Sequence, residues 1–194
     1  MRTIKTDKRS KYTQEMIKRS LLKLMGIKPL TKITVAELCT DAGVNRITFY
    51  NHFNDIYDVY NQIENDFLTQ LLVKIDGIKT EDPQRAALRE IILLLYRNVE
   101  FCAIILNSDG DFIHRLMDSF KDKYMSEVAS RYRGISQEIL HALYTFQVSG
   151  NLGLVADWIK RGMLESPEAM TSMIERINKN LIFGFFGRQI TVVP

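Results

Sequence analysis

The chain has 194 residues, of which 46% are hydrophobic and 25% are charged, and its formal net charge is +3. This composition excludes an intrinsically disordered chain, because enough apolar side chain is present to bury a core. No apolar stretch approaches the ~20 residues that a membrane-spanning helix needs, so we expect no membrane contact and a cytoplasmic location. Cys39 and Cys102 stand far apart in apolar helical contexts, which predicts buried thiols and no disulfide framework.

Positive charge is concentrated at the N-terminal end. Residues 1–52 carry a net charge of +7, and the remainder carries −4. The first eleven residues hold five basic side chains, one acid and few apolar residues, which predicts an arm that is disordered in the free protein. Such an arm follows nucleic-acid phosphates, enters a minor groove, or only keeps the chain soluble. Its basic residues are Arg2, Lys5, Lys8, Arg9 and Lys11.

Three helices are predicted after this arm. Apolar residues recur with helical spacing over residues 13–25, which predicts an amphipathic first helix. Thr34 and Glu37 form the S/T-x-x-E pattern of a capping box, so we expect a second helix to begin near Val35. Gly43 then supplies a left-handed residue that ends this helix, and a third helix is predicted to start almost at once.

The third predicted helix exposes polar and aromatic side chains where an ordinary surface helix exposes Glu and Lys. Asn45 is a competent N-cap, while Val44, Ile47, Phe53 and one edge of Phe49 are spaced to pack onto the preceding helix. Arg and Asn can pair with purine edges, Thr can touch a thymine methyl, and Tyr and His can bond phosphates. The pattern favours a helix-turn-helix DNA reader; the alternative is an ordinary solvated helical hairpin. The candidate DNA-binding residues are Thr34, Asn45, Arg46, Thr48, Tyr50, Asn51 and His52, with Arg46, Thr48 and Asn51 expected on bases and Tyr50 and His52 on phosphates.

The run from about Thr13 to Phe67 resembles the DNA-binding domain of the TetR/AcrR family of bacterial transcriptional regulators. The residues that carry the resemblance are ITVAELCTDAGVNRITFYNHFND, with an Ile-Thr-Val entry, an Ala-Gly-Val turn, a Thr-Phe-Tyr recognition helix and a His-Phe ending. The resemblance implies an all-α fold, with an N-terminal three-helix helix-turn-helix domain and a C-terminal helical bundle, and a double-stranded DNA target. One departure argues against tight DNA binding, because many members carry Lys at the position of Ile56, where it supports a phosphate contact.

A fourth helix is predicted to begin at Ile56, with Asp55 as its N-cap and its free N–H groups able to meet a phosphate. Gly77 marks a hinge, and Asp82 and Pro83 are expected to begin the next helix. The predicted domains are 1–54 for the arm and DNA-binding domain, 55–76 for a connecting helix, and 77–194 for a helical ligand-binding and dimerisation domain.

The remaining sequence is typical of a helical bundle. Residues 86–96 are apolar nearly all round, which predicts a central helix, and Ser136 and Ser166 are expected to begin the last two helices. The family resemblance implies a cavity in the bundle for an unidentified small-molecule effector. Candidate lining residues, each of which also suits a plain core, are Tyr96, Phe101, His114, Tyr144, Phe146 and Trp158.

The segment FQVSGNLGLVADWIKRGMLESPEAM, residues 146–170, resembles the C-terminal region of a Firmicutes subgroup of the family that includes the dihydroxyacetone kinase regulators. Within it, Ser149, Gly150 and Gly153 predict a close helix crossing. A single short reader helix contacts too few bases, so we expect a homodimer. The apolar stripes of the last two helices either join the two copies or complete the monomer core.

No enzyme, metal or cofactor site is expected. His52, His114 and His141 lack metal-ligand spacing, and the sequence contains neither a G-x-S-x-G motif nor a phosphate-binding glycine loop. The sequence therefore predicts a transcriptional regulator, more readily a repressor, that binds a palindromic operator as a dimer and is released by an effector. The alternative is a co-regulator of the same fold that acts mainly through protein–protein interaction, which Ile56 favours.

Overall fold

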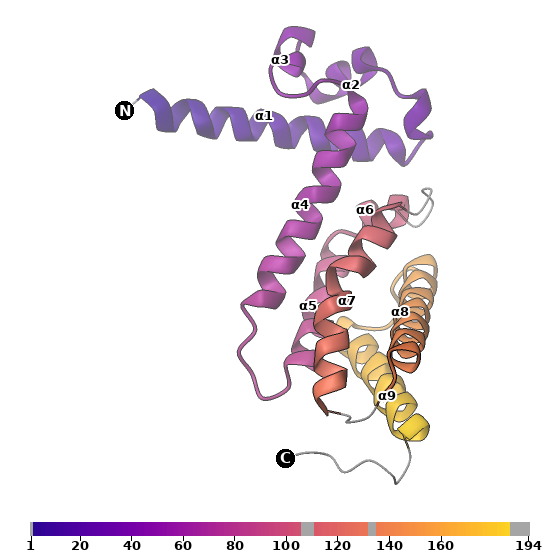
Figure 1. The fold of residues 1–194 in the computed structure, drawn as a ribbon. Helices are drawn as coiled ribbons and strands as arrows, with labels where there is room; N and C mark the ends of the chain where they lie inside the picture. Colours follow the sequence, from indigo (N-terminus) through magenta and orange to yellow (C-terminus); the bar gives the residue numbers. More distant parts are fainter. Residues whose placement is uncertain (1, 106–110, 132–134, 187–194) are drawn as a thin grey trace. The chain divides into compact units, whose positions relative to one another are not determined.

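Helices form all the regular structure that the computed structural model describes, which covers residues 2–105, 111–131 and 135–186 (Figure 1). The predicted all-α class is confirmed. No helix in these ranges is long and apolar enough to cross a bilayer. The helices are α1 (Arg2–Met25), α2 (Val35–Ala42), α3 (Arg46–Tyr50), α4 (Ile56–Asp76), α5 (Pro83–Arg97), α6 (Val99–Ile105), α7 (Asp111–Arg131), α8 (Gln137–Lys160) and α9 (Pro167–Phe186), with a 3-10 turn, Leu30–Lys32, before α2.

The chain divides into two compact units, Met1–Gln70 and Leu71–Pro194. In the N-terminal unit α1 packs on α2, and α2 packs on α3. This is the predicted three-helix domain followed by a helical bundle. The finer division at residues 54 and 76 stays a prediction, since α4 runs through the boundary between the two units without a break.

The first helix is longer than the sequence indicates. Residues 2–12, expected as a disordered arm, continue the helix predicted over 13–25. No glycine or proline interrupts this stretch, and extending a formed helix costs little, whereas nucleating one is the unfavourable step. Ile17 and Leu21, both completely buried, anchor the helix in the core, and the chain propagates it toward the N-terminus.

The core of the N-terminal unit takes one stripe from each of its helices. Lys18 lies at its edge with a side chain only 11% exposed, and its Nζ is 2.5 Å from Oδ2 of Asp66 on α4. The ion pair compensates a charge that burial would otherwise penalise. The side chains with no exposed surface are Ile17 and Leu21 of α1, Leu38 of α2, Phe49 of α3 and Val59 of α4.

In the C-terminal unit α5 packs against α9, and α7 packs against α8 (Figure 1). Arg85 links α5 to α9 through ion pairs with Glu168 at 2.8 Å and Glu175 at 2.6 Å. The expectation that α5 is enclosed on all sides is wrong. Only Ile92 and Leu94 of this helix are buried, because its neighbours cover one face and leave the rest partly exposed.

Hydrogen bonds confirm the predicted starts of three bundle helices. Asp82 Oδ1 accepts from the N–H of Arg85 at 3.0 Å, with Pro83 as the first residue of α5. The hydroxyls of Ser136 and Ser166 accept from backbone N–H groups three residues further on, at 3.4 and 3.2 Å. Each cap satisfies a donor that a helix start leaves free, so local chemistry alone places these starts.

The predicted close crossing at Gly150 and Gly153 does not occur within the described chain. A Cβ atom added to either glycine would meet no described atom within 4 Å. Both glycines of α8 therefore face open space, and no helix of the same unit packs closely on them.

Both cysteines are free and buried, as predicted. Burial raises the pKa of the Cys102 thiol to about 12, so this group stays neutral and packs as a small apolar side chain.

Candidate nucleic-acid interface

The start of α2 is held by the predicted capping box. The Thr34 hydroxyl accepts from the N–H of Glu37 at 3.3 Å, and the N–H of Thr34 donates to Glu37 Oε2 at 3.0 Å. A hydrogen bond from Lys28 at 2.6 Å, followed by those from Thr34, lowers the pKa of Glu37 to about 2. The carboxylate therefore stays charged at neutral pH. Gly43, with φ 64°, then ends α2 in the left-handed conformation that glycine tolerates best.

The recognition helix α3 begins at its predicted cap. Asn45 Oδ1 accepts from the N–H of Thr48 at 2.7 Å. Phe49 is completely buried and Phe53 is 2% exposed, with their ring centroids 5.9 Å apart. The two rings stand one helical turn apart and fasten this short helix to the core.

The predicted packing face of α3 needs a correction. Ile47 was expected to pack inward, but it is 76% exposed, and Phe49 is buried fully rather than along one edge. The two residues are two positions apart, so they lie on nearly opposite sides of a helix with 3.6 residues per turn. Burying Phe49 completely therefore turns Ile47 to solvent.

The outer face of α3 presents Arg46, Ile47, Tyr50 and Asn51, all exposed. This face joins a guanidinium, an amide and a phenol, which can bond bases or phosphates, to an apolar group that suits a thymine methyl. Ile47 is the residue that the sequence analysis missed. The sequence indicates this by the position of Ile47, two residues before Phe49, because two large apolar side chains at that spacing lie on nearly opposite sides of a helix.

The other candidate residues are less available. Thr48 and His52 are half-buried, and the side chains of Thr34 and Asn45 are exposed but already engaged in helix caps. Of the seven candidates, three therefore gather on the outer face of α3, two flank it and two hold the helix starts.

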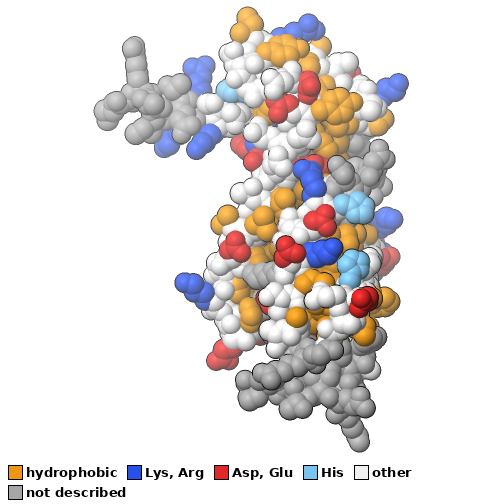
Figure 2. Space-filling view, in the orientation of Figure 1, with side chains coloured by type: hydrophobic (Ala, Val, Ile, Leu, Met, Phe, Trp, Pro, Cys, Tyr) orange, Lys and Arg blue, Asp and Glu red, His pale blue; other side chains and the backbone are white. Residues whose placement is uncertain are grey.

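Helix α1 passes beside the end of the recognition helix. Gln14 Nε2 lies 3.4 Å from Nδ1 of His52, directly after α3. Lys8, Arg9 and Lys11, all exposed, precede Gln14 on the same helix. Figure 2 shows Lys and Arg side chains along α1. The basic stretch therefore continues past the C-terminal end of α3.

The start of α4 differs from the expected phosphate site. Asp55 Oδ1 accepts from the N–H of Asp58 at 2.8 Å, which confirms Asp55 as the N-cap. Asp58 Oδ2 accepts in turn from the N–H of Asn54 at 2.8 Å. Two carboxylates thus occupy this helix start and oppose a phosphate. Ile56 is only 7% exposed and packs in the core, where a Lys head group would be desolvated.

The six residues expected around an effector do not enclose one site. Phe101, Tyr144 and Trp158 are core residues with at most 5% exposure. Tyr96 stacks on Trp158 with ring centroids 6.1 Å apart and is itself 47% exposed. The remaining two, His114 and Phe146, are exposed, with 65% of Phe146 open to solvent. Aromatic composition therefore selected core and surface residues here. Which side chains line a cavity depends on how the helices pack, and only the structure shows this.

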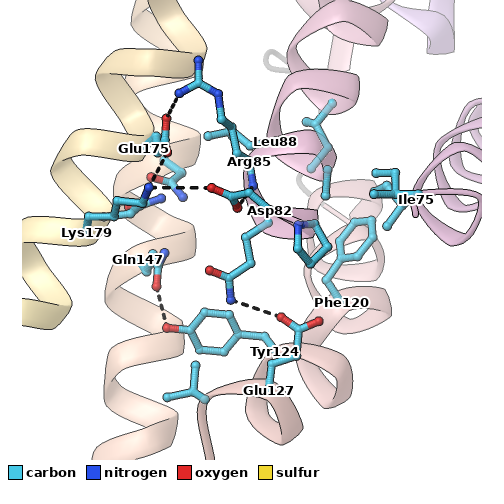
Figure 3. Close-up of a pocket in the computed structure, with 18 residues that line it drawn as sticks. Ile75, Asp82, Arg85, Leu88, Phe120, Tyr124, Glu127, Gln147, Glu175 and Lys179 are labelled. Carbon is cyan, nitrogen blue, oxygen red and sulfur yellow. Dashed lines mark hydrogen bonds and ion pairs between the residues drawn. The ribbon is translucent and has the colours of Figure 1, made fainter. Parts of the chain in front are cut away.

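A cavity of about 270 Å³ lies elsewhere in the C-terminal unit, between α5, α7, α8 and α9 and the last turns of α4 (Figure 3). None of the six candidates lines it. Its lining residues are Ile75, Ile78, Asp82, Pro83, Gln84, Arg85, Ala87, Leu88, Ile91, Phe120, Tyr124, Glu127, Val128, Gln147, Asn151, Glu175, Asn178 and Lys179.

A short capped helix after a glycine turn, with an exposed polar face, defines a helix-turn-helix protein. A TetR-type family model described as "Transcriptional regulator C-terminal region" matches residues 84–180, half of the chain. The chain belongs to the TetR/AcrR family of transcriptional regulators. The family's members are regulators and not enzymes, in agreement with the sequence analysis.

Individual relatives agree with this assignment. The HTH-type transcriptional regulator YxbF of Bacillus subtilis (strain 168) is 20% identical over 188 residues, and the match covers 91% of this chain. The chain spans about half the length of that relative, since the match covers 48% of it.

Two solved structures show the same fold. The dihydroxyacetone kinase operon activator DhaS is 22% identical, with 88% of this chain and 96% of that chain covered and a TM-score of 0.64. A TetR transcriptional regulator from Streptococcus agalactiae 2603V is 18% identical, with 90% and 98% covered and a TM-score of 0.67.

Proposed function

We propose that this regulator binds a palindromic operator as a homodimer, represses transcription there, and is released by a small-molecule effector. The observation that carries the proposal is the outer face of α3. In it Arg46 and Asn51 reach base edges, Ile47 contacts a thymine methyl, and Tyr50 bonds a phosphate. Thr48 and His52 contribute at the flanks, while Thr34 and Asn45 hold the helices that present this face.

The N-terminal stretch is helical, which favours its contact with DNA phosphates over insertion into a minor groove. The sequence alone left both alternatives open. An α-helix with side chains is about 10–12 Å wide, whereas the minor groove of B-DNA is about 6 Å wide. A continuous helix therefore does not enter that groove. Because Gln14 lies beside the end of α3, Arg9 stands about 7.5 Å further along α1 at about 1.5 Å per residue. We therefore propose that Lys8 and Arg9 contact phosphates that flank the bases read by α3.

Replacing Lys8 and Arg9 together by Ala is expected to weaken duplex binding and to flatten its salt dependence. Each lost phosphate contact removes about 0.9 from the slope of log K against log salt concentration. The charge-preserving variant Lys8→Arg with Arg9→Lys should keep the wild-type slope. Anisotropy titrations at several salt concentrations measure both, and an unchanged slope in the alanine variant would show that α1 makes no such contact.

The dimer contact is proposed on α8 and α9. Exposed residues recur along α8 at alternating spacings of three and four, which is the pattern of a helix–helix seam. Phe146 is 65% exposed in this stripe, and the open space at Gly153 lets a second copy approach closely. On α9, Ile177 is a further apolar side chain that is 44% exposed. The exposed stripe on α8 consists of Ile139, Ala142, Phe146, Ser149 and Gly153.

Effector release is proposed through α4. This helix begins six residues after the end of α3, and Ile75 in its last turn lines the cavity of the C-terminal unit. A ligand in the cavity that favours another position of Ile75 would also favour another position of α4, the helix that follows the recognition helix α3. With the ligand bound, the favoured dimer would be one in which the two copies of α3 no longer fit both DNA half-sites, which lowers operator affinity.

The DNA-binding proposal is tested with Arg46→Ala and Tyr50→Ala. Each should weaken operator binding about tenfold or more at ~150 mM salt, because the dimer loses each contact twice. The base contact of Arg46 contributes about 1–3 kcal/mol, and the hydrogen bond of Tyr50 to a charged phosphate about 1.5–3 kcal/mol. Arg97→Ala is the matched control, since Arg97 is an exposed arginine on α5. Gel shifts give the affinities and circular dichroism verifies the folds. Wild-type affinity in both variants would refute the assignment.

The co-regulator remains the second candidate, and the start of α4 favours it. Asp55 and Asp58 place two carboxylates beside Ile56, which is buried and stands where the family resemblance implies a Lys in many members. A protein of this kind would bind duplexes weakly on its own. Flat, negligible binding across salt concentrations supports the co-regulator, whereas a steep salt dependence supports the DNA reader.

A further inference from the structure

The cavity of the C-terminal unit has one apolar side and one polar side (Figure 3). Ile75 and Ile78 close it at the end of α4, Leu88 and Ile91 line it from α5, and Phe120 lines it from α7. Surfaces of this kind bind the hydrocarbon part of a small ligand by removing it from water. At about 270 Å³ the space suits a single small molecule.

The charged groups at the cavity largely neutralise one another. Lys179 Nζ lies 2.6 Å from Glu175 and 3.7 Å from Asp82, and Arg85 also pairs with Glu175 at 2.6 Å. Glu127 adds a third carboxylate, which accepts from the neutral amide of Gln84 at 3.2 Å. The lining therefore holds three acids and two bases, an excess that opposes an anionic ligand. A cationic ligand would have to compete with the two bases for Asp82 and Glu175, and with the Gln84 amide for Glu127.

Besides Gln84, three side-chain amides supply uncharged polar groups. Tyr124 Oη donates to Gln147 Oε1 at 2.5 Å, which leaves the amide N–H groups of Gln147 as donors. The half-buried side chains of Asn151 and Asn178 form no hydrogen bond with another described residue. Each of these amides offers both a donor and an acceptor, which matches hydroxyl and amide groups better than ions.

We propose that this cavity binds a small uncharged molecule that has an apolar body and a hydroxyl or amide group. The apolar body lies against the isoleucines of α4 and α5, and the polar group bonds both Gln147 and Asn151. The inference rests on the proposed effector response and names the ligand class for it. The residues assigned to the ligand include none of the six candidates from the sequence analysis.

The test uses three probes of nearly equal size: benzyl alcohol, benzylammonium and benzoate. They are titrated into the full chain without DNA and followed by NMR chemical shifts. Benzyl alcohol should bind in the millimolar range expected for so small a molecule, about tenfold more tightly than benzoate and more tightly than benzylammonium. Tighter binding of either ion, or no saturable shift for benzyl alcohol up to about 10 mM, would overturn the proposal.

Variants locate the binding. Gln147→Leu and Asn151→Leu should each weaken benzyl alcohol about tenfold, because each removes one hydrogen bond to the ligand without loss of volume. Asn151→Leu should leave the thermal midpoint near its wild-type value, whereas Gln147→Leu also removes the acceptor of the Tyr124 hydroxyl and should lower the midpoint. His141→Leu, at an exposed position of α8 outside the cavity, is the control. Equal weakening in all three variants, or in none, contradicts the assignment. A chain that binds its operator but not benzyl alcohol overturns this inference alone, and a chain that binds benzyl alcohol but no DNA overturns the proposed DNA binding alone.

Discussion

Phe49→Ala is expected to unfold the recognition helix and to abolish DNA binding. Phe49 has no exposed surface, packs on Phe53 at a centroid distance of 5.9 Å, and is the buried anchor of a five-residue helix. Replacing a buried Phe by Ala costs about 3–5 kcal/mol, against a total stability of about 5–15 kcal/mol for a typical domain. A helix this short has no stability of its own, so it depends on this packing.

The matched control is Ile47→Ala on the same helix. Ile47 is 76% exposed, so its truncation should change the free energy of unfolding by no more than about 0.5 kcal/mol. Urea titrations followed by circular dichroism measure both variants, and gel shifts measure their DNA affinity. If Phe49→Ala and Ile47→Ala destabilise the protein equally, the described burial of α3 is wrong.

Phe146→Glu is expected to separate the dimer and thereby to weaken operator binding about a hundredfold or more. Each copy would place an unpaired carboxylate in an apolar contact, and burying an unpaired charge costs several kcal/mol. A monomer engages one half-site and loses the advantage of binding two linked sites. Within its own chain Phe146 is 65% exposed, so the substitution should leave the folded monomer intact.

His141→Glu adds the same charge at an exposed position of α8 outside the proposed stripe. It should remain a dimer with wild-type affinity. Sedimentation velocity gives the oligomeric state and gel shifts give the affinity. A Phe146→Glu protein that still sediments as a dimer would place the contact between copies elsewhere.

The parts of the fold that were predicted correctly depend on local chemistry. A capping box at Thr34 and Glu37, a glycine at 43 and caps at Asn45 and Asp82 each satisfy backbone groups of their own helix, so a few neighbouring residues determine them. Hydrophobic spacing likewise identified the amphipathic helices, since a helix places every third and fourth residue on one face.

The errors arose where packing between distant residues decides the outcome. Ile47 and Phe49 are both large and apolar, and the spacing of a five-residue helix does not decide which of them turns inward; contact with Phe53 does. The basic stretch before Thr13 has the composition of a disordered arm, yet the buried residues that follow nucleate a helix that extends through it.

The cavity was missed for a related reason. Its lining residues come from five helices, and most of them, such as Ile75 and Asn151, look like ordinary core or surface positions in the sequence. Large aromatic residues such as Trp158 fill space instead of enclosing it.

Selection of bound duplexes from a random pool, with the purified full chain at ~150 mM salt, tests the central claim most directly. Two copies of α3 in a two-fold dimer should enrich an inverted repeat whose half-site centres lie about 34–36 Å apart or at a multiple of that distance. Repeating the selection with Arg46→Ala should lose the preference at one base pair of each half-site. Enrichment of no sequence, or of one half-site without its inverted copy, would contradict a dimer that reads DNA through α3.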